Sequence, residues 1–452
     1  MHLRTPGVAA IAFALALAAC SPTSQPSPTP ASGSTPGPAS SGATPSNPGA
    51  STPAASPDRV AGWQSDLALL IPGMERLHKD LYHGVSEAAL ADAVAALSAT
   101  VPTATDDELM DGVMRIVAMV SAGGCDAHTG AYVWGTGTYH PLDSLPLRLW
   151  LFGDDVVVVA ALPPYGDLVG KRVASIEGHP IADVIAALDP LVPRDNEQTV
   201  RLLLPRFLLI PEILRGLGLA DAGGVTLGIG GGGAGEAVHE VTPIPMADYN
   251  GWAGPYGLHL PANPDVPYLS RIDDVLWWEL LEDGETLYVQ YNRTDYLPAK
   301  QFDDLGAAMR DPAVERVVLD LRHNYGGELH ALEPMIELFQ DPAFDVPGRL
   351  FVATGRNTFS GGSIVVARLD RETAAEIVGE PMGGCPTFWS DPATLDLPWS
   401  GIEVGVSDDV AIGVEAADTR HGILPDTTLE LTLEEWLAGD DPVLAGFIGS
   451  GP

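Results

Sequence analysis

DLRHNYGGE, residues 320–328, connects a strand-like segment at 316–321 to a helix-like segment at 329–339. GRNTFSGGS, residues 355–363, stands in the same way between a strand-like and a helix-like segment. Adjacent glycines at a strand-to-helix turn let backbone N–H groups face outward without a Cβ in the way, which suits an oxyanion hole. A serine at such a turn, here Ser360, is accessible to a substrate, although it could instead simply cap the helix.

Around these two turns, strand and helix patterns alternate. Strand-like segments stand at 287–291 and 349–354, and a helix-like segment stands at 299–309. Such alternation predicts an α/β layer structure in which the loops after the strands carry the chemistry. Upstream, the apolar spacing of residues 58–120 is helical, and residues 147–188 mix short strands with one helix.

A Gly-x-Gly-x-x-Gly pattern at 228–233 follows the strand-like segment 225–227. The next segment, 236–241, has a strand pattern, whereas a phosphate-binding loop needs the N-terminus of a helix there. We therefore predict a hairpin loop and no nucleotide site.

Charge and length limit the function further. The chain has 452 residues, and Lys+Arg 23 against Asp+Glu 60 gives a net charge of −37. The length predicts two or three folded units. Nucleic acid is excluded as a partner, because its binding depends on Lys and Arg that neutralise phosphates.

The first 57 residues predict secretion. Residues 1–19 form a signal peptide whose end, LAAC at 17–20, resembles the lipobox of bacterial lipoproteins, which implies a lipid on Cys20. The alternative is an ordinary signal peptide with a chance cysteine. Residues 20–57, rich in Ser, Pro and Thr, predict a disordered linker. We expect an extracytoplasmic protein held at the cell membrane by lipid.

Five motifs in order resemble the tail-specific (C-terminal-processing) serine peptidases, which include tricorn. They are CDAHT at 125–129, DLRHNYGG at 320–327, TFS at 358–360, VGE at 378–380 and GILPD at 422–426. The resemblance implies a Clp/crotonase-like α/β catalytic domain at 251–452, an N-terminal helical region at 58–135 and a PDZ-like mixed α/β module at 136–250. It also implies peptide or protein substrates and no cofactor.

The family's commonest branch activates its serine with a lysine, but this chain has no lysine beyond Lys300, and Cys385 stands at the matching place. The tricorn-like branch uses a histidine, for which His128 is the match. We expect Asp418, with Glu415 as second choice, to orient His128, and His323 is the competing base. The resemblance places the oxyanion donors at Gly361 and at Gly326 or Gly327.

The family positions of Cys125 and Cys385 border the same site, which predicts a disulfide between them. An alternative is a zinc site formed by both cysteines and His128. The leading function is a serine peptidase that works through an acyl-enzyme. One alternative is an inactive relative that binds peptide or a small hydrophobic ligand in the same cleft. Another is an esterase that uses Ser360, Asp418 and His421.

Overall fold

The computed structural model describes residues 56–132, 142–230, 237–254, 258–415 and 418–448. The predicted signal peptide, Cys20 and nearly all of the predicted linker lie outside these residues. Every described residue belongs to one compact unit, Ala54–Pro452. Within the described part of the chain, no helix has the length and apolar character needed to cross a membrane.

Three helices begin this unit, as the sequence predicts: α1 (Pro57–Leu77), α2 (Glu87–Thr100) and α3 (Asp106–Ala118). Each starts at a hydroxyl residue, Ser56, Ser86 or Thr105, whose side chain accepts a hydrogen bond from a first-turn N–H group. The short helix η1 (Val120–Gly123) and strand β1 (Gly130–Ala131) follow, and His128 lies between them.

A mixed α/β region comes next. It contains β2 (Asp143–Ser144), β3 (Leu147–Phe152), β4 (Asp155–Ala161), η2 (Tyr165–Leu168), β5 (Val173–Ile176), β6 (His179–Pro180), α4 (Ile181–Leu188), η3 (Asp189–Leu191), α5 (Glu197–Phe207), α6 (Pro211–Gly216), β7 (Val225–Ile229), β8 (Ala237–Val241), β9 (Ile244–Pro245) and α7 (Met246–Ala253). Strands β6, β5, β7 and β8 form a sheet in that order. Strands β7 and β8 pair antiparallel, so a strand follows the glycine pattern, as predicted, and not a helix. Residues 231–236, which include part of that pattern, lie outside the described residues.

The second half contains a six-stranded sheet in the order β10-β11-β12-β13-β14-β17. Its strands are β10 (Leu276–Leu280), β11 (Thr286–Tyr291), β12 (Arg316–Asp320), β13 (Leu350–Thr354), β14 (Glu376–Gly379) and β17 (Thr427–Thr428). The pairs from β11 to β17 are parallel. The mixed α/β class is therefore confirmed.

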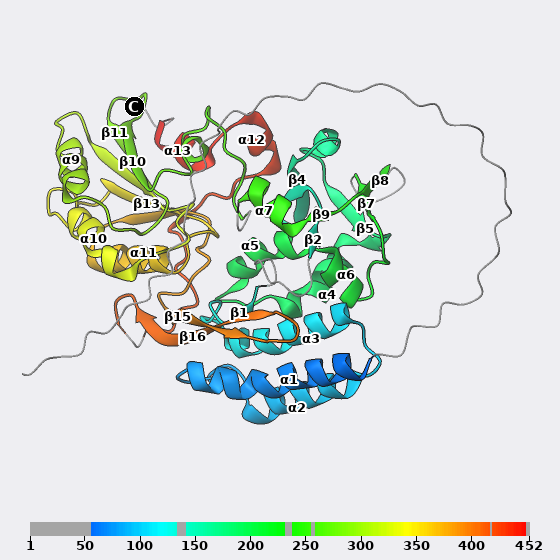
Figure 1. Ribbon diagram of the computed structural model, residues 1–452. Helices are drawn as coiled ribbons and strands as arrows, with labels where there is room; N and C mark the ends of the chain where they lie inside the picture. The colour runs from blue at the N-terminus through cyan, green and yellow to red at the C-terminus, as the bar shows by residue number, and fades with distance from the viewer. Residues whose placement is uncertain (1–55, 133–141, 231–236, 255–257, 416–417, 449–452) are drawn as a thin grey trace, which may run out of the picture. The chain divides into compact units, whose positions relative to one another are not determined.

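Helices cover both faces of this sheet. Val317 and Leu319 of β12 face a core shared with α9 (Ala299–Met309), α10 (Glu333–Phe339), which follows η4 (Leu329–Ala331), and α11 (Gly361–Glu372). Val318, between them, faces a second core with α8 (Pro267–Ser270), α12 (Leu433–Ala438) and α13 (Pro442–Ile448). Successive strand side chains point to opposite faces, so one apolar run serves both cores. Figure 1 shows α9, α10 and α11 together beside this sheet.

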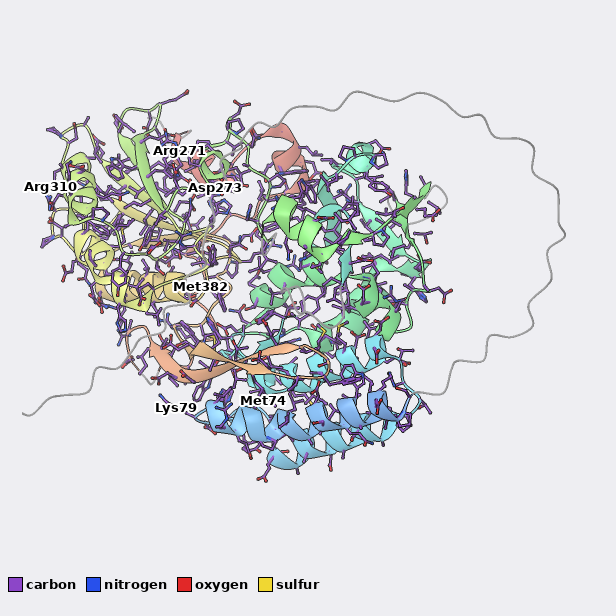
Figure 2. The ribbon with its side chains drawn as sticks, viewed as in Figure 1. Met74, Lys79, Arg271, Asp273, Arg310 and Met382 are labelled. Carbon is purple, nitrogen blue, oxygen red and sulfur yellow. A yellow bond between two sulfur atoms is a disulfide. The ribbon has the colours of Figure 1, made fainter. Side chains whose placement is uncertain are left out.

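A hairpin of β15 (Thr387–Asp396) and β16 (Glu403–Ile412) links the two halves. Its strand β16 pairs with β1, so that the sheet order is β1-β16-β15. Leu395, Val404 and Val406 of the hairpin are buried in the core of the N-terminal helices, which also contains Met74 of α1 (Figure 2). The hairpin thus brings the segment of residues 125–131 to the six-stranded sheet.

Candidate active site

Ser360 stands directly before α11, in the turn that follows β13. Its backbone has φ 51° and ψ −123°, a conformation that costs a non-glycine residue energy and is typical of strained functional turns. No hydrogen bond from its side chain caps the helix. Helix capping therefore does not explain this serine.

His128 meets Ser360 across 232 residues of sequence. Its Nε2 lies 3.2 Å from Ser360 Oγ, within reach for a base that takes the hydroxyl proton. The imidazole is stacked between the rings of Phe359 and Phe388, with centroids 4.8 and 5.4 Å away. Two aromatic faces thus fix the plane of the base.

The surroundings of His128 keep its imidazole neutral. Burial lowers the pKa of His128 to about 4, although the charge of Asp126 and the nearby Trp389 backbone act to raise it. Its Nδ1 is buried without a hydrogen-bond partner in the described part of the chain. To act as a base, the imidazole needs its lone pair on Nε2, which faces Ser360, and its proton on Nδ1.

The expected orienting acid is wrong. Asp418 pairs with Arg420, whose guanidinium also contacts Asp370, and Glu415 pairs with Arg371. Each carboxylate is held by an arginine through a charge-assisted contact, and neither is bonded to His128. In the described part of the chain, His128 is oriented by the rings of Phe359 and Phe388 and by no acid bonded to Nδ1.

The competing base, His323, is placed elsewhere. Its ring stacks on Tyr268 at 5.7 Å and meets His259 edge to face at 6.3 Å. Burial is the main reason that the pKa of His323 is lowered to about 3. Its contacts belong to the core behind the glycine turn, whereas the ring bonded to Ser360 is that of His128.

The glycine turn lies directly against the serine. A Cβ added at Gly326, where φ is +103°, would lie 2.5 Å from Ser360 Cβ and 2.9 Å from its Oγ. The Gly326 N–H, however, donates to Asn324 Oδ1 at 3.0 Å. The prediction of Gly326 as an oxyanion donor is therefore corrected: Gly326 provides space and is not the donor. Among the described residues, no acceptor is bonded to the amides of Gly327 and Gly361, which are the available donors.

Asn324 joins the two turns. Besides accepting from Gly326, its side chain donates to the Tyr291 carbonyl at 2.9 Å, and its own carbonyl accepts from Phe359 N–H at 3.0 Å. Beneath them, the buried Asp320 binds Arg322, which also forms two hydrogen bonds with Asp441. The DLRHN sequence thus builds a rigid base for the glycines.

The predicted disulfide is confirmed. Cys125 and Cys385 are bonded, with their Cα atoms 5.5 Å apart. Because both sulfurs are in this bond, neither is a thiolate, and the alternative zinc site that includes His128 is wrong.

Asp195 is a site residue that the sequence did not indicate. Its fully buried carboxylate accepts from Ala127 N–H at 2.7 Å and from Cys385 N–H at 3.2 Å. Burial raises the pKa of Asp195 to about 7 against these two hydrogen bonds. Asp195 thus fixes the backbone next to His128, but no sequence motif surrounds Asp195 and signals this role. Phe359, whose ring stacks on His128, did have such a signal, because it directly precedes Ser360 in the sequence.

Comparison with known proteins supports the fold. No family model matches the chain and no curated protein matches it. Among solved structures, mature CPAF complexed with lactacystin is 14% identical with a TM-score of 0.57, over 86% of this chain and 98% of that one. Another structure of mature CPAF is 14% identical with a TM-score of 0.56, over 87% of this chain and 99% of that one.

The tricorn protease is also found, at 15% identity and a TM-score of 0.40 over 86% of this chain and 36% of that one, which is too low a score to add weight. The chain has the fold of CPAF over nearly the whole of that protein.

Proposed function

We propose that this chain is a serine peptidase that hydrolyses peptide bonds through an acyl-enzyme, held outside the cytoplasm by a lipid on Cys20. The observation that carries the proposal is the 3.2 Å approach of His128 Nε2 to Ser360 Oγ. The fold shared with CPAF, the strained serine and the two amides beside it agree with this activity. Lipid attachment rests on the LAAC sequence alone.

In the first step, His128 Nε2 takes the hydroxyl proton while Ser360 Oγ bonds to the substrate's carbonyl carbon. The amides of Gly361 and Gly327 hold the resulting oxyanion. The imidazolium then gives its proton to the amine that leaves, and the C–N bond breaks. Water, activated by the same imidazole, releases the acyl group and restores Ser360.

Labelling with a fluorophosphonate probe tests the proposal. We expect the wild type and Ser65→Ala, a change on an exposed face of α1, to be labelled and to cleave unstructured peptides. Ser360→Ala should lose both properties, and lactacystin, with which CPAF was complexed, should compete with the probe. Labelling that persists in Ser360→Ala would overturn the assignment. A wild type that binds peptides without being labelled would indicate the inactive relative.

A further inference from the structure

A second cluster of reactive side chains lies beside the β15–β16 hairpin. It consists of His78, which follows α1, His83, in the turn before α2, and Asp126. One ligand atom of each lies within 4.8 Å of the others. The side chains of His78 and Asp126 are fully buried, and that of His83 is 15% exposed. Figure 2 labels Lys79 next to this cluster, at the end of α1.

The imidazole of His83 is oriented as a ligand would be. Its Nδ1 donates to the Asp80 carbonyl at 3.0 Å, which leaves the lone pair on Nε2. That Nε2 is buried without a hydrogen-bond partner in the described part of the chain, 3.7 Å from Asp126 Oδ2. A lone pair that faces a carboxylate oxygen in a buried place is unfavourable unless a cation lies between them.

The other two residues complete a set of three. Asp126 Oδ2 accepts from His78 Nε2 at 3.1 Å, and its Oδ1 accepts from the Ser407 hydroxyl at 2.6 Å, which fixes the carboxylate. The ring of Trp389 packs on both imidazoles, at 4.5 and 5.1 Å between centroids. Fixed ligands with outer hydrogen bonds and an apolar wall are typical of metal sites.

We propose that His78 Nε2, His83 Nε2 and Asp126 Oδ2 bind one divalent transition-metal ion of the zinc type. Two imidazoles and one carboxylate suit Zn²⁺ better than Mg²⁺ or Ca²⁺, which prefer oxygen ligands. The fourth position, on the partly exposed side of His83, is left to water. The ion would join the turn at 78–83 to the segment of residues 125–131, which carries His128.

Binding requires one rearrangement. His78 Nδ1 now accepts from Asp80 N–H at 3.0 Å, so the proton of this imidazole is on Nε2. To bind a metal through Nε2, that proton must move to Nδ1, and the bond from Asp80 is lost. Asp80 is exposed in the turn between the two helices, whereas Leu81 of the same turn is buried in the core, so the adjustment is confined to Asp80 and the His78 ring.

Zinc uptake by the full chain, without a polyhistidine tag, tests the proposal. After treatment with EDTA, the protein is equilibrated with zinc sulfate, and bound zinc is measured by mass spectrometry. We expect one zinc per chain in the wild type, in Ser360→Ala and in His179→Gln, a control at an exposed histidine of β6. His83→Gln should lose this zinc, and Co²⁺ should give the visible absorption of a tetrahedral site only where His83 is present.

Melting curves keep the result interpretable. In EDTA, His83→Gln should show the cooperative melting transition of a folded protein. Zinc should raise the melting temperature of the wild type but not that of His83→Gln. A wild type that takes up no zinc would overturn the proposal. The space between His83 Nε2 and Asp126 Oδ2 would then hold a shared proton and no metal ion. Equal uptake by His83→Gln and the wild type would also overturn it. Because uptake is expected in Ser360→Ala, neither outcome depends on peptidase activity.

Discussion

The backbone of Gly326 lies so close to the Ser360 side chain that no side-chain atom fits at position 326. A Cβ at position 326 would collide with both Cβ and Oγ of the serine, and the φ of +103° is unfavourable for any L side chain. The glycine is thus required by geometry at the reacting atom itself.

Gly326→Ala should lower kcat by about 10²-fold or more, because Oγ and the oxyanion donors would be displaced. Gly178→Ala is the matched control, since Gly178 also has a positive φ, +77°, but has open space around it. Active-site titration with a fluorophosphonate and steady-state kinetics would measure the effect. An unchanged kcat in Gly326→Ala would show that the turn relaxes away from the serine.

Asp111 of α3 carries a carboxyl group in a place that disfavours its charge. Neither side-chain oxygen has a hydrogen-bond partner among the described residues, and burial, followed by the charge of Asp107, raises the pKa of Asp111 to about 9. The folded state therefore keeps a proton that the unfolded state releases above its ordinary pKa of 3.8. Stability falls as the pH rises between these two values.

Asp111→Asn should remove this pH dependence. The stability gained over wild type should grow by about 1.4 kcal/mol per pH unit between roughly pH 5 and pH 8. Urea unfolding at several pH values measures it, with the exposed Asp183→Asn as the control. Parallel stability curves for wild type and Asp111→Asn would contradict the expectation.

At the scale of elements, two strand-to-helix turns and one hairpin build the site. The turns after β12 and β13 lie side by side because those strands are parallel neighbours. The hairpin of β15 and β16 brings the ring of Phe388 onto the imidazole of His128. The Cys125–Cys385 bond joins the histidine segment to the start of this hairpin.

Replacing both cysteines by alanine should destabilise the protein by up to about 5 kcal/mol, because the bond closes a loop of 260 residues that gains entropy when opened. It should also lower kcat, since Cys125 precedes His128 by three residues. Urea unfolding under non-reducing conditions and peptide kinetics would measure both. Equal stability of the two proteins would show that Asp195 and the surrounding core hold the segment without the disulfide.

At the scale of the whole molecule, the proposed attachment through a lipid on Cys20 can be tested by itself. Cys20→Ser should release the protein from the membrane fraction and abolish incorporation of labelled palmitate, because the thiol that would carry the lipid is gone. Ser21→Ala is the neighbouring control, and fluorophosphonate labelling of Ser360 should be unchanged in both. Cys20→Ser that remains in the membrane fraction would contradict lipid anchoring.

Local patterns in the sequence were sufficient for most elements of the six-stranded sheet. The segments predicted at 287–291, 299–309 and 349–354 are strand β11, helix α9 and strand β13. The signals that define such segments, apolar periodicity and terminal glycines, involve only neighbouring residues and can therefore be recognised in the sequence. Ser360, His128 and the disulfide came from motifs in a recognisable order, and the boundaries of the predicted PDZ-like module stay a prediction.

The sequence by itself determined which chemical groups are present and the turns that carry Ser360 and the glycines, because these depend on neighbouring residues. Only the tertiary structure decided that Asp418 binds Arg420, and that Gly326 gives its N–H to Asn324. It also brought His83 to Asp126. A polar group bonds to the nearest suitable partner in space, and that distance is set by how the cores pack, which no separation along the chain records.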